Sequence, residues 1–211
     1  MIVPDVIAIT DPRWSDEELV LRSETVLGAV PPGSVALQLR DKVRGSQAML
    51  SLGERLRAIC ARHRAPFYVN DRLDMAMILA ADGVHLGDAS VDVGDARALL
   101  GPEAFISTAA HDADDVDRAR LGGATAVLVS PIYATPAKGA PQGTRLLSEA
   151  RDRAQGIRVY ALGGVDGSNA ALCRRAGADG VAVVRAMWDG SDPSSTARSL
   201  VAIVRDPHGP G

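Results

Sequence analysis

The sequence predicts an α/β protein and, more specifically, a (β/α)8 TIM barrel. Eight short apolar runs rich in β-branched residues alternate with eight longer segments of helical periodicity. The length of 211 residues is close to the minimum that eight such units need. A doubly wound open sheet produces the same alternation and is the structural alternative. We favour the barrel because the units number eight and because Thr10-Asp11-Pro12, not a glycine-rich dinucleotide turn, follows the first strand.

The expected elements are short strands separated by helices of ordinary length. We expect strands over Val6–Thr10, Ala36–Arg40, Pro66–Val69, Gly83–His85, Phe105–Thr108, Ala126–Ser130, Arg158–Leu162 and Gly180–Val184. We expect helices over Asp16–Leu27, Gln47–Arg64, Asp71–Ala80, Val91–Leu100, Ala113–Leu121, Thr144–Ala154, Asn169–Ala176 and Ser194–Val204. Together they predict one barrel domain over residues 1–205 and a frayed tail, rich in proline and glycine, over residues 206–211.

The composition indicates a sizeable core and is compatible with a small anionic ligand. Hydrophobic residues make up 46% of the chain and aromatic residues only 3%, so we expect a core of Val, Leu, Ile, Ala and Met. The net charge is −3 and no run of basic residues occurs, which argues against a nucleic-acid partner. Cys60 and Cys173 lie far apart without metal-binding spacing, which is typical of a reducing compartment.

The first residues lack the features of a signal peptide, and no apolar run approaches the roughly 20 residues that span a bilayer. We therefore expect a cytoplasmic protein with no membrane partner. A homo-oligomer is compatible with these features.

Polar residues that follow the expected strands are the candidates for function, because parallel barrels place their sites at the C-terminal ends of the strands. After the second strand, alternation puts Gln38, Arg40 and Lys42 on one side, where an amide and two cations suit an anion. The alternative interpretation of these residues is a solvated strand end.

Asn70 and Asp71 follow the third strand, where either is expected to cap the next helix. A carboxylate there also suits Mg²⁺, which takes few protein ligands beside phosphates. His85 after the fourth strand points into the barrel or lines the site, and we favour the structural role. His111 after the fifth strand is a general acid/base candidate or simply opens the next helix.

The longest irregular stretch follows the sixth strand, over residues 130–143, and includes Thr135 and the cation Lys138. A loop of this length at the functional end is typical of a lid or binding loop. Gly163-Gly164 and Val184-Arg185 follow the last two strands, where many barrels bind a phosphate group. We therefore expect a phosphate site beside these residues.

Taken together, these segments are similar to the superfamily of thiamine-phosphate synthase (thiamine-phosphate pyrophosphorylase) and thiazole tautomerase, and the resemblance runs through nearly the whole chain. The segments that carry it, in order, are Ala8-Ile9-Thr10-Asp11, Gln38-Leu39-Arg40-Asp41-Lys42, Val69-Asn70-Asp71-Arg72, Asp82-Gly83-Val84-His85-Leu86-Gly87, Ser130-Pro131-Ile132-Tyr133 with Lys138 and Gln142-Gly143, Ala161-Leu162-Gly163-Gly164, and Ala176-Gly177-Ala178-Asp179-Gly180-Val181-Ala182-Val183. The family fold is a (β/α)8 barrel.

The resemblance implies a transferase that joins an aminopyrimidine to a thiazole phosphate, with Mg²⁺ assisting the loss of pyrophosphate. The residues that it assigns to the pyrimidine and pyrophosphate are Gln38, Arg40, Lys42, Asn70 and Lys138, and Thr135 is a further substrate-binding candidate. The residues that it assigns to the thiazole phosphate are Gly163, Gly164 and the region of Val184, where Arg185 adds a cation as a further substrate-binding candidate. Asp71 would bind Mg²⁺, and Asp88 is a second candidate ligand. The catalytic candidates are His111, Lys138 and Arg40.

The chain departs from the family pattern mainly on the pyrophosphate side. Synthases usually carry a second metal-binding Asp where Ser90 stands, a Ser where Ala109 stands and a second Thr where Ala137 stands. Arg185 replaces a Ser after the eighth strand. These losses weaken the expected hold on Mg²⁺ and pyrophosphate.

Two alternatives to the synthase follow from these departures. The first is a thiazole tautomerase, which needs no metal and would use His111 as its general acid/base. The second is a non-catalytic binder of thiazole or thiamine phosphate. The intact Gln38, Arg40, Lys42 and Asn70-Asp71 groups place the synthase slightly ahead.

Overall fold

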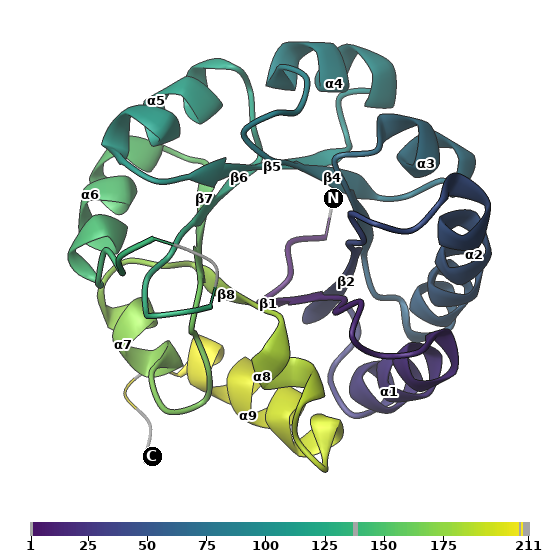
Figure 1. Ribbon diagram of the computed structural model, residues 1–211. Helices are drawn as coiled ribbons and strands as arrows, with labels where there is room; N and C mark the ends of the chain where they lie inside the picture. The colour runs from purple at the N-terminus through teal and green to yellow at the C-terminus, as the bar shows by residue number, and fades with distance from the viewer. Residues whose placement is uncertain (1, 137–138, 207, 209–211) are drawn as a thin grey trace.

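The computed structural model describes residues 2–136, 139–206 and 208 and shows a closed parallel barrel ringed by helices (Figure 1). Its strands are β1 (Val6–Ile9), β2 (Val35–Leu39), β3 (Phe67–Asn70), β4 (Gly83–Leu86), β5 (Phe105–Ala110), β6 (Ala126–Val129), β7 (Arg158–Leu162) and β8 (Gly180–Val183). Its helices are α1 (Asp16–Gly28), α2 (Ser46–His63), α3 (Leu73–Ile78), α4 (Val93–Leu100), α5 (Ala113–Leu121), α6 (Arg145–Ala154), α7 (Ala170–Arg175), α8 (Arg185–Trp188) and α9 (Pro193–Arg205).

Closure of the sheet decides between the two predicted architectures. β1 pairs in parallel with β2 on one side and with β8 on the other, so the described strands leave no open edge. The prediction of a (β/α)8 barrel is therefore confirmed and the open doubly wound sheet is excluded. None of the described helices has the length and apolar character that crossing a membrane requires.

The core has two parts because each strand buries both faces. Outward-facing strand residues pack with the helices in the larger cluster, which contains Val35 and Leu37 of β2 as well as Leu56 of α2. The barrel interior is a smaller cluster that contains the aromatic rings of Tyr68, Phe105 and Tyr160. These are three of the seven aromatic residues of the chain; the other four, Trp14, Phe67, Tyr133 and Trp188, belong to the helix-facing layer.

Two element predictions were wrong, and both errors lie next to the candidate site. The third helix begins at Leu73 rather than Asp71, because Asp71 adopts a left-handed φ of 60° that an α-helix excludes. The chain after β8 forms the short helix α8, which Trp188 fixes by donating from Nε1 to the Ile9 carbonyl at 2.6 Å. Most of the predicted frayed tail, residues 207 and 209–211, lies outside the described residues.

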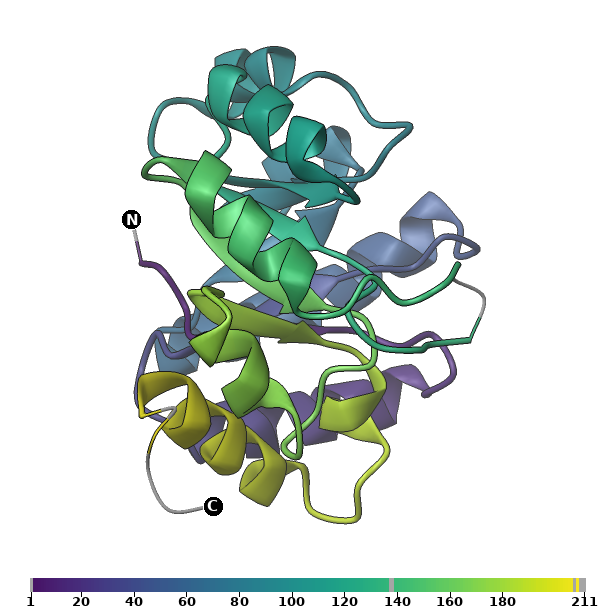
Figure 2. The same ribbon diagram turned by 90° about the vertical axis from the view of Figure 1, so that its left-hand side faces the viewer.

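The two ends of the barrel are clearly distinguished in a side view (Figure 2). The N-terminal segment lies at one end, and the described parts of the loop between β6 and α6 lie at the other. That second end carries the C-terminal ends of the strands, where the candidate residues converge.

Candidate active site

Two neighbouring cavities open at the C-terminal end of the strands. The first, which we call the Gln38 cavity, has a volume of about 530 Å³, and its polar lining residues include Gln38, Arg40, Lys42, Asn70, Asp71, His85, Asp88, His111 and Gln142. The second, the Arg185 cavity, has a volume of about 600 Å³, and its lining includes Arg40, Thr135, Gly163, Gly164, Asp166, Val184, Arg185 and Asp189. Ile9, Arg40 and Leu162 line both cavities. The site is therefore bipartite, and Arg40 is the charged residue at its junction.

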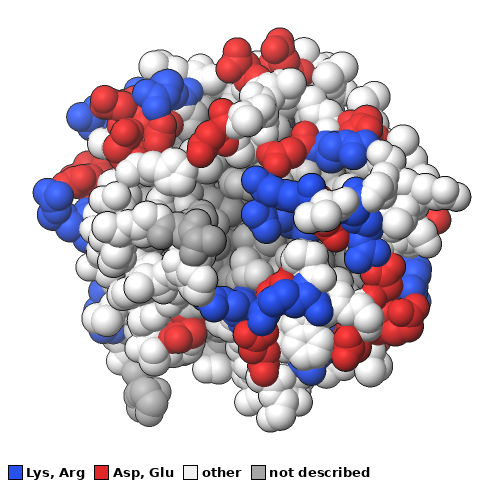
Figure 3. Space-filling view, viewed as in Figure 1, with Lys and Arg blue, Asp and Glu red and all other residues white. Residues whose placement is uncertain are grey.

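Lys and Arg side chains gather around the hollow at this end of the molecule (Figure 3). Among the described residues, Arg40 and Lys42 are the cations that line the Gln38 cavity, and Arg40 and Arg185 line the Arg185 cavity. Each cavity therefore offers two cations to an anionic ligand. Lys138, predicted to join them from the loop, lies outside the described residues.

Arg40 is held in place by Thr10, a residue to which the sequence analysis gave no role. The Thr10 hydroxyl donates to the Arg40 carbonyl at 3.1 Å and accepts from the Arg40 backbone N–H at 2.8 Å. Thr10 itself is 2% exposed and donates from its backbone N–H to the Gln38 carbonyl at 2.9 Å. The turn after β2 is therefore locked to the turn after β1, and this fixes the backbone from which Arg40 projects.

Gln38 and Asn70 form a buried amide pair on adjacent strands. Gln38 Nε2 donates to Asn70 Oδ1 at 3.0 Å, and both residues are largely buried. Gln38 Oε1 is enclosed and has no hydrogen-bond partner among the described residues. A buried acceptor without a partner is costly, so this oxygen is placed to receive a donor from a ligand.

Asp71 is a carboxylate anchored by donors from the loop after β4 and from the last residue of β3. Its Oδ1 accepts from the Gly87 backbone N–H at 2.9 Å and from the Ser90 hydroxyl at 2.5 Å, and its Oδ2 accepts from Asn70 Nδ2 at 2.5 Å. Burial raises the pKa of Asp71, but the hydrogen bonds from Ser90 and Gly87 outweigh it and hold the pKa below its ordinary value. The predicted capping role was wrong: Arg72 is the N-cap of α3, and no side chain caps that helix.

Asp71 fits Mg²⁺ as a single-carboxylate site. A carboxylate has about four acceptor positions, so the three hydrogen bonds leave one direction for a metal. In the part of the chain that the structure describes, no group of three or more His, Cys, Asp or Glu residues forms a metal cluster. Mg²⁺ commonly uses only one or two protein carboxylates and completes its shell with phosphate oxygens and water.

The two candidate histidines occupy different environments at this end. His85 is 8% exposed, faces the Ser107 hydroxyl with Nδ1 at 3.0 Å and also lines the Gln38 cavity. His111 is more exposed; its Nδ1 lies 2.7 Å from the Ser130 carbonyl oxygen and its Nε2 lies 3.4 Å from Asp88 Oδ1. Because a carbonyl only accepts, Nδ1 carries a proton and donates it to the Ser130 carbonyl, while Nε2 faces Asp88.

Gly163 and Gly164 both line the Arg185 cavity, but their backbone has a structural reason to be glycine. Their φ angles are +94° and +64°, and a Cβ on Gly164 would lie 2.7 Å from Tyr133 Cβ and 2.8 Å from the Ala134 carbonyl oxygen. The loop after β6 is therefore packed directly on the Gly-Gly turn, and the Tyr133 N–H donates to the Gly163 carbonyl at 2.9 Å. The two glycines therefore admit this loop, and the phosphate site expected beside them stays a prediction.

Replacement of Gly164 by alanine is expected to destabilise the fold by about 2 to 4 kcal/mol, because strain at a positive φ adds to overpacking. Urea denaturation measures this as a lower unfolding midpoint. Gly139→Ala is the matched control, since a Cβ there meets no atom of the described residues within 4 Å, and its effect is expected to stay within about 0.5 kcal/mol. Equal midpoints for the two variants would refute the packing explanation.

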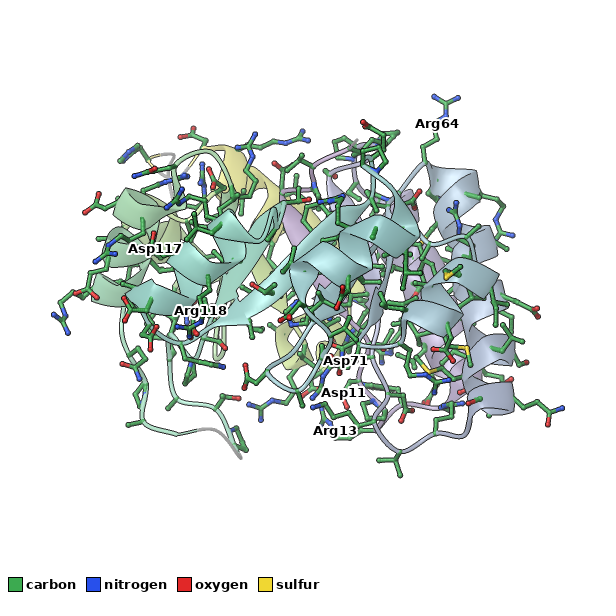
Figure 4. All side chains as sticks on the ribbon, turned by 90° about the horizontal axis from the view of Figure 1, so that it is seen from above. Asp11, Arg13, Arg64, Asp71, Asp117 and Arg118 are labelled. Atoms are coloured by element: carbon green, nitrogen blue, oxygen red, sulfur yellow. The ribbon has the colours of Figure 1, made fainter. Side chains whose placement is uncertain are left out.

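The rim of the Arg185 cavity is a network of charged residues. Arg185 donates to the Thr135 hydroxyl at 3.2 Å and so joins α8 to the loop after β6. Arg13 bridges Asp11 at 2.6 Å and Asp189 at 2.7 Å on the same rim, where Figure 4 shows Asp11 and Arg13 together. Burial raises the pKa of Asp11, but the Arg13 contacts outweigh it and leave the pKa lowered. The Thr10-Asp11 segment was noticed in the sequence, yet nothing in it pointed to these contacts.

A family model described as thiamine monophosphate synthase matches residues 6–187 of the chain. The chain is 37% identical over 198 residues to the thiamine-phosphate synthase of Roseiflexus castenholzii, covering 92% of this chain and 86% of that protein. It is 38% identical over 195 residues to the thiamine biosynthesis bifunctional protein ThiM/ThiE of Symbiobacterium thermophilum, covering 85% of this chain. It spans only 40% of that bifunctional protein's length.

A solved structure supports the same relationship. The thiamine phosphate pyrophosphorylase of Pyrococcus furiosus matches with a TM-score of 0.84 and 28% identity, and the match covers 97% of each chain. The Pyrococcus furiosus protein therefore shares the barrel and the order of its elements with the present chain along nearly the whole length of both.

Proposed function

Because the chain belongs to the thiamine monophosphate synthase family, we propose that its barrel rim couples hydroxymethylpyrimidine diphosphate to thiazole phosphate and releases pyrophosphate. This is transferase chemistry in thiamine biosynthesis. The observation that carries the proposal is the pair of cavities joined at Arg40, because the reaction brings two phosphorylated molecules together. A site with one anion pocket would suit a one-substrate reaction better.

The Gln38 cavity is proposed to bind the pyrimidine diphosphate. The unpartnered Gln38 Oε1 would accept from the amino group of the pyrimidine, and Asn70 holds the Gln38 amide in that orientation. Arg40 and Lys42 would hold the diphosphate and stabilise the negative charge that develops on it as the carbon–oxygen bond breaks. Lys138 is proposed to add a further cation.

Mg²⁺ is proposed to sit on the free side of Asp71, where it would neutralise charge on the diphosphate. Asp88 lines the same cavity and is 76% exposed, so it is available as a further ligand. The residues present fit a weakly held metal that binds together with substrate phosphates.

The Arg185 cavity is proposed to bind the thiazole phosphate. Arg185 and Thr135 contact each other at its edge, so one phosphate can accept from the guanidinium and from the hydroxyl. Gly163, Gly164 and Val184 supply the backbone of the two loops beside them. Arg40 between the cavities would keep the two anions close enough to react despite their repulsion.

The test is a pyrophosphate-release assay with both substrates. Release that requires the thiazole phosphate and Mg²⁺ is the expected result. No release under these conditions would remove the synthase proposal, and calorimetric binding of the ligands without turnover would point to the non-catalytic binder.

The tautomerase alternative finds no support in the names of the relatives reported above. His111→Ala separates the two reactions, because aromatisation of the thiazole needs a proton acceptor at His111 Nε2. We expect the variant to retain pyrophosphate release, which depends on the cations of the Gln38 cavity. A loss of metal-independent aromatisation in this variant, with no pyrophosphate release in the wild type, would favour the tautomerase instead.

A further inference from the structure

A separate cavity of about 480 Å³ lies at the N-terminal end of the barrel and has no part in the proposed reaction. It lies under Ile2 and is bordered by the end of α2, by β3 and by the segment before β5. Arg64 lines it, and Figure 4 shows Arg64 at the end of the molecule opposite Asp11, Arg13 and Asp71. Its volume falls in the range of small-molecule pockets, roughly 300 to 1,000 Å³.

Tyr68 forms part of this cavity and has a hydroxyl without a partner among the described residues. The residue is 1% exposed, and its ring is stacked on Phe105 with centroids 4.5 Å apart and planes 7° apart. The hydroxyl therefore cannot turn away to find another partner. Burial raises the pKa of Tyr68 well above its ordinary value, so the group stays a neutral donor.

Tyr160 belongs to the same interior cluster as Tyr68, but its hydroxyl has a hydrogen-bond partner. Its hydroxyl donates to the Pro4 carbonyl at 2.6 Å, so the N-terminal segment supplies its partner. The Tyr68 hydroxyl has no such partner among the described residues. Tyr68 lines the N-terminal cavity, whereas Tyr160 is not among its lining residues. The enclosed Gln38 Oε1 marks the proposed pyrimidine pocket in the same way.

The mouth of the cavity carries two free charges of opposite sign. Arg64 and Glu103 are exposed, and neither forms an ion pair with another described residue. Arg57 and Asp82, which also line the cavity, lie 3.5 Å apart, and Asp82 further accepts from the Phe67 N–H at 2.9 Å. Between mouth and floor the walls are apolar, with Leu100 and Phe105 among them.

We propose that this cavity binds an aromatic α-amino acid with a polar tip, of which L-tyrosine is the prototype. The carboxylate would face Arg64, the ammonium would face Glu103, the ring would lie against Phe105 and Leu100, and the phenol oxygen would accept from Tyr68. Ile2 is 53% exposed and belongs to a segment without regular structure, so it is the wall that gives way on entry.

Calorimetric titration of the intact chain with L-tyrosine and L-phenylalanine tests the floor of the site, because the two probes differ by one hydroxyl. The wild type is expected to bind L-tyrosine about tenfold more tightly, and Tyr68→Phe is expected to bind both equally. Tyr160→Phe is the matched control and should keep the preference, since its hydroxyl does not line the cavity. No binding, or no preference in the wild type, would overturn the proposal.

The mouth is tested with probes that lack one charge. Tyramine lacks the carboxylate, so Arg64→Gln, which weakens L-tyrosine binding, should strengthen tyramine binding by removing a like charge. 4-Hydroxyphenylpropionate lacks the ammonium, so Glu103→Gln should strengthen its binding and weaken that of L-tyrosine. A crystal grown with L-tyrosine that shows only an ordered water at the Tyr68 hydroxyl would also overturn the proposal, because the hydroxyl would then have a solvent partner.

Discussion

Replacement of Arg40 by alanine is expected to lower kcat/KM for pyrophosphate release by about 100- to 1,000-fold, the cost of removing a pre-placed group that stabilises developing charge. The reason is geometric: Arg40 is the charged residue that lines both cavities at the functional end. Its loss removes a cation from each anion pocket and leaves two phosphorylated ligands to repel each other. Steady-state kinetics with both substrates varied measures the effect.

The variants of Thr10 and Lys42 serve as controls for this prediction. Thr10→Val keeps the Arg40 guanidinium but removes the hydroxyl that holds residue 40 by two hydrogen bonds, so a smaller loss is expected. Lys42→Ala removes one cation from the Gln38 cavity and none from the Arg185 cavity, so it should raise KM for the pyrimidine substrate alone. If Arg40→Ala likewise changed KM for one substrate only, Arg40 would not act at the junction.

The barrel itself could be predicted from local patterns. Buried parallel strands are apolar on both faces, and helical segments between them have a period that short runs of sequence already contain. The strand ends were correct within one or two residues, so the polar residues that follow them were placed at the correct end of the barrel. For this reason Gln38, Arg40, Lys42, Asn70 and Asp71 were found without any long-range information.

The parts that could not be predicted depend on contacts between distant segments. Asp71 leaves the helical region because its carboxylate bonds to Gly87 and Ser90, which belong to the next loop. The junction role of Arg40 follows from barrel closure, which brings the turn after β2 beside the loops after β7 and β8. The sequence pattern of a single segment therefore predicts neither the Asp71 conformation nor the position of Arg40 between the cavities.

For the glycine pair, the sequence predicts the position in the fold but not the contact that requires glycine there. Gly163-Gly164 was placed correctly after β7, but the sequence connected the pair only with a phosphate site and not with a contact to another part of the chain. That contact is with the chain at Tyr133 and Ala134, some thirty residues earlier. The phosphate site beside the glycines therefore stays a prediction.

Asp71→Asn is expected to lower kcat/KM for pyrophosphate release by about 100-fold and to reduce the dependence of the rate on Mg²⁺. Asp71 is the best-anchored carboxylate of the Gln38 cavity, with donors from Gly87, Ser90 and Asn70. The asparagine can keep part of this hydrogen-bonding while losing the charge, so the fold should survive. Calorimetry with Mg²⁺ and pyrophosphate measures metal binding apart from turnover; unchanged binding would show that Asp71 is not the ligand.

Ser90→Asp is the converse experiment, because it places a second carboxylate against Asp71. In the wild type the lowered pKa of Asp71 means that its stabilising contribution is present above the unfolded pKa and is lost as the pH falls through the folded value. A second carboxylate replaces the Ser90 donor with a like charge and raises the pKa of Asp71, so the variant should lose stability as the pH rises towards neutrality.

Mg²⁺ is expected to reverse that loss, since the cation neutralises both carboxylates. The melting temperature of Ser90→Asp at neutral pH should therefore rise on addition of Mg²⁺ more than that of the wild type, and affinity for the metal should increase about tenfold. Ser90→Ala is the matched control, because it removes the hydroxyl that donates to Asp71 without adding charge. If both variants responded alike to Mg²⁺, the metal would bind elsewhere and Ser90 would have no bearing on the weak hold predicted for it.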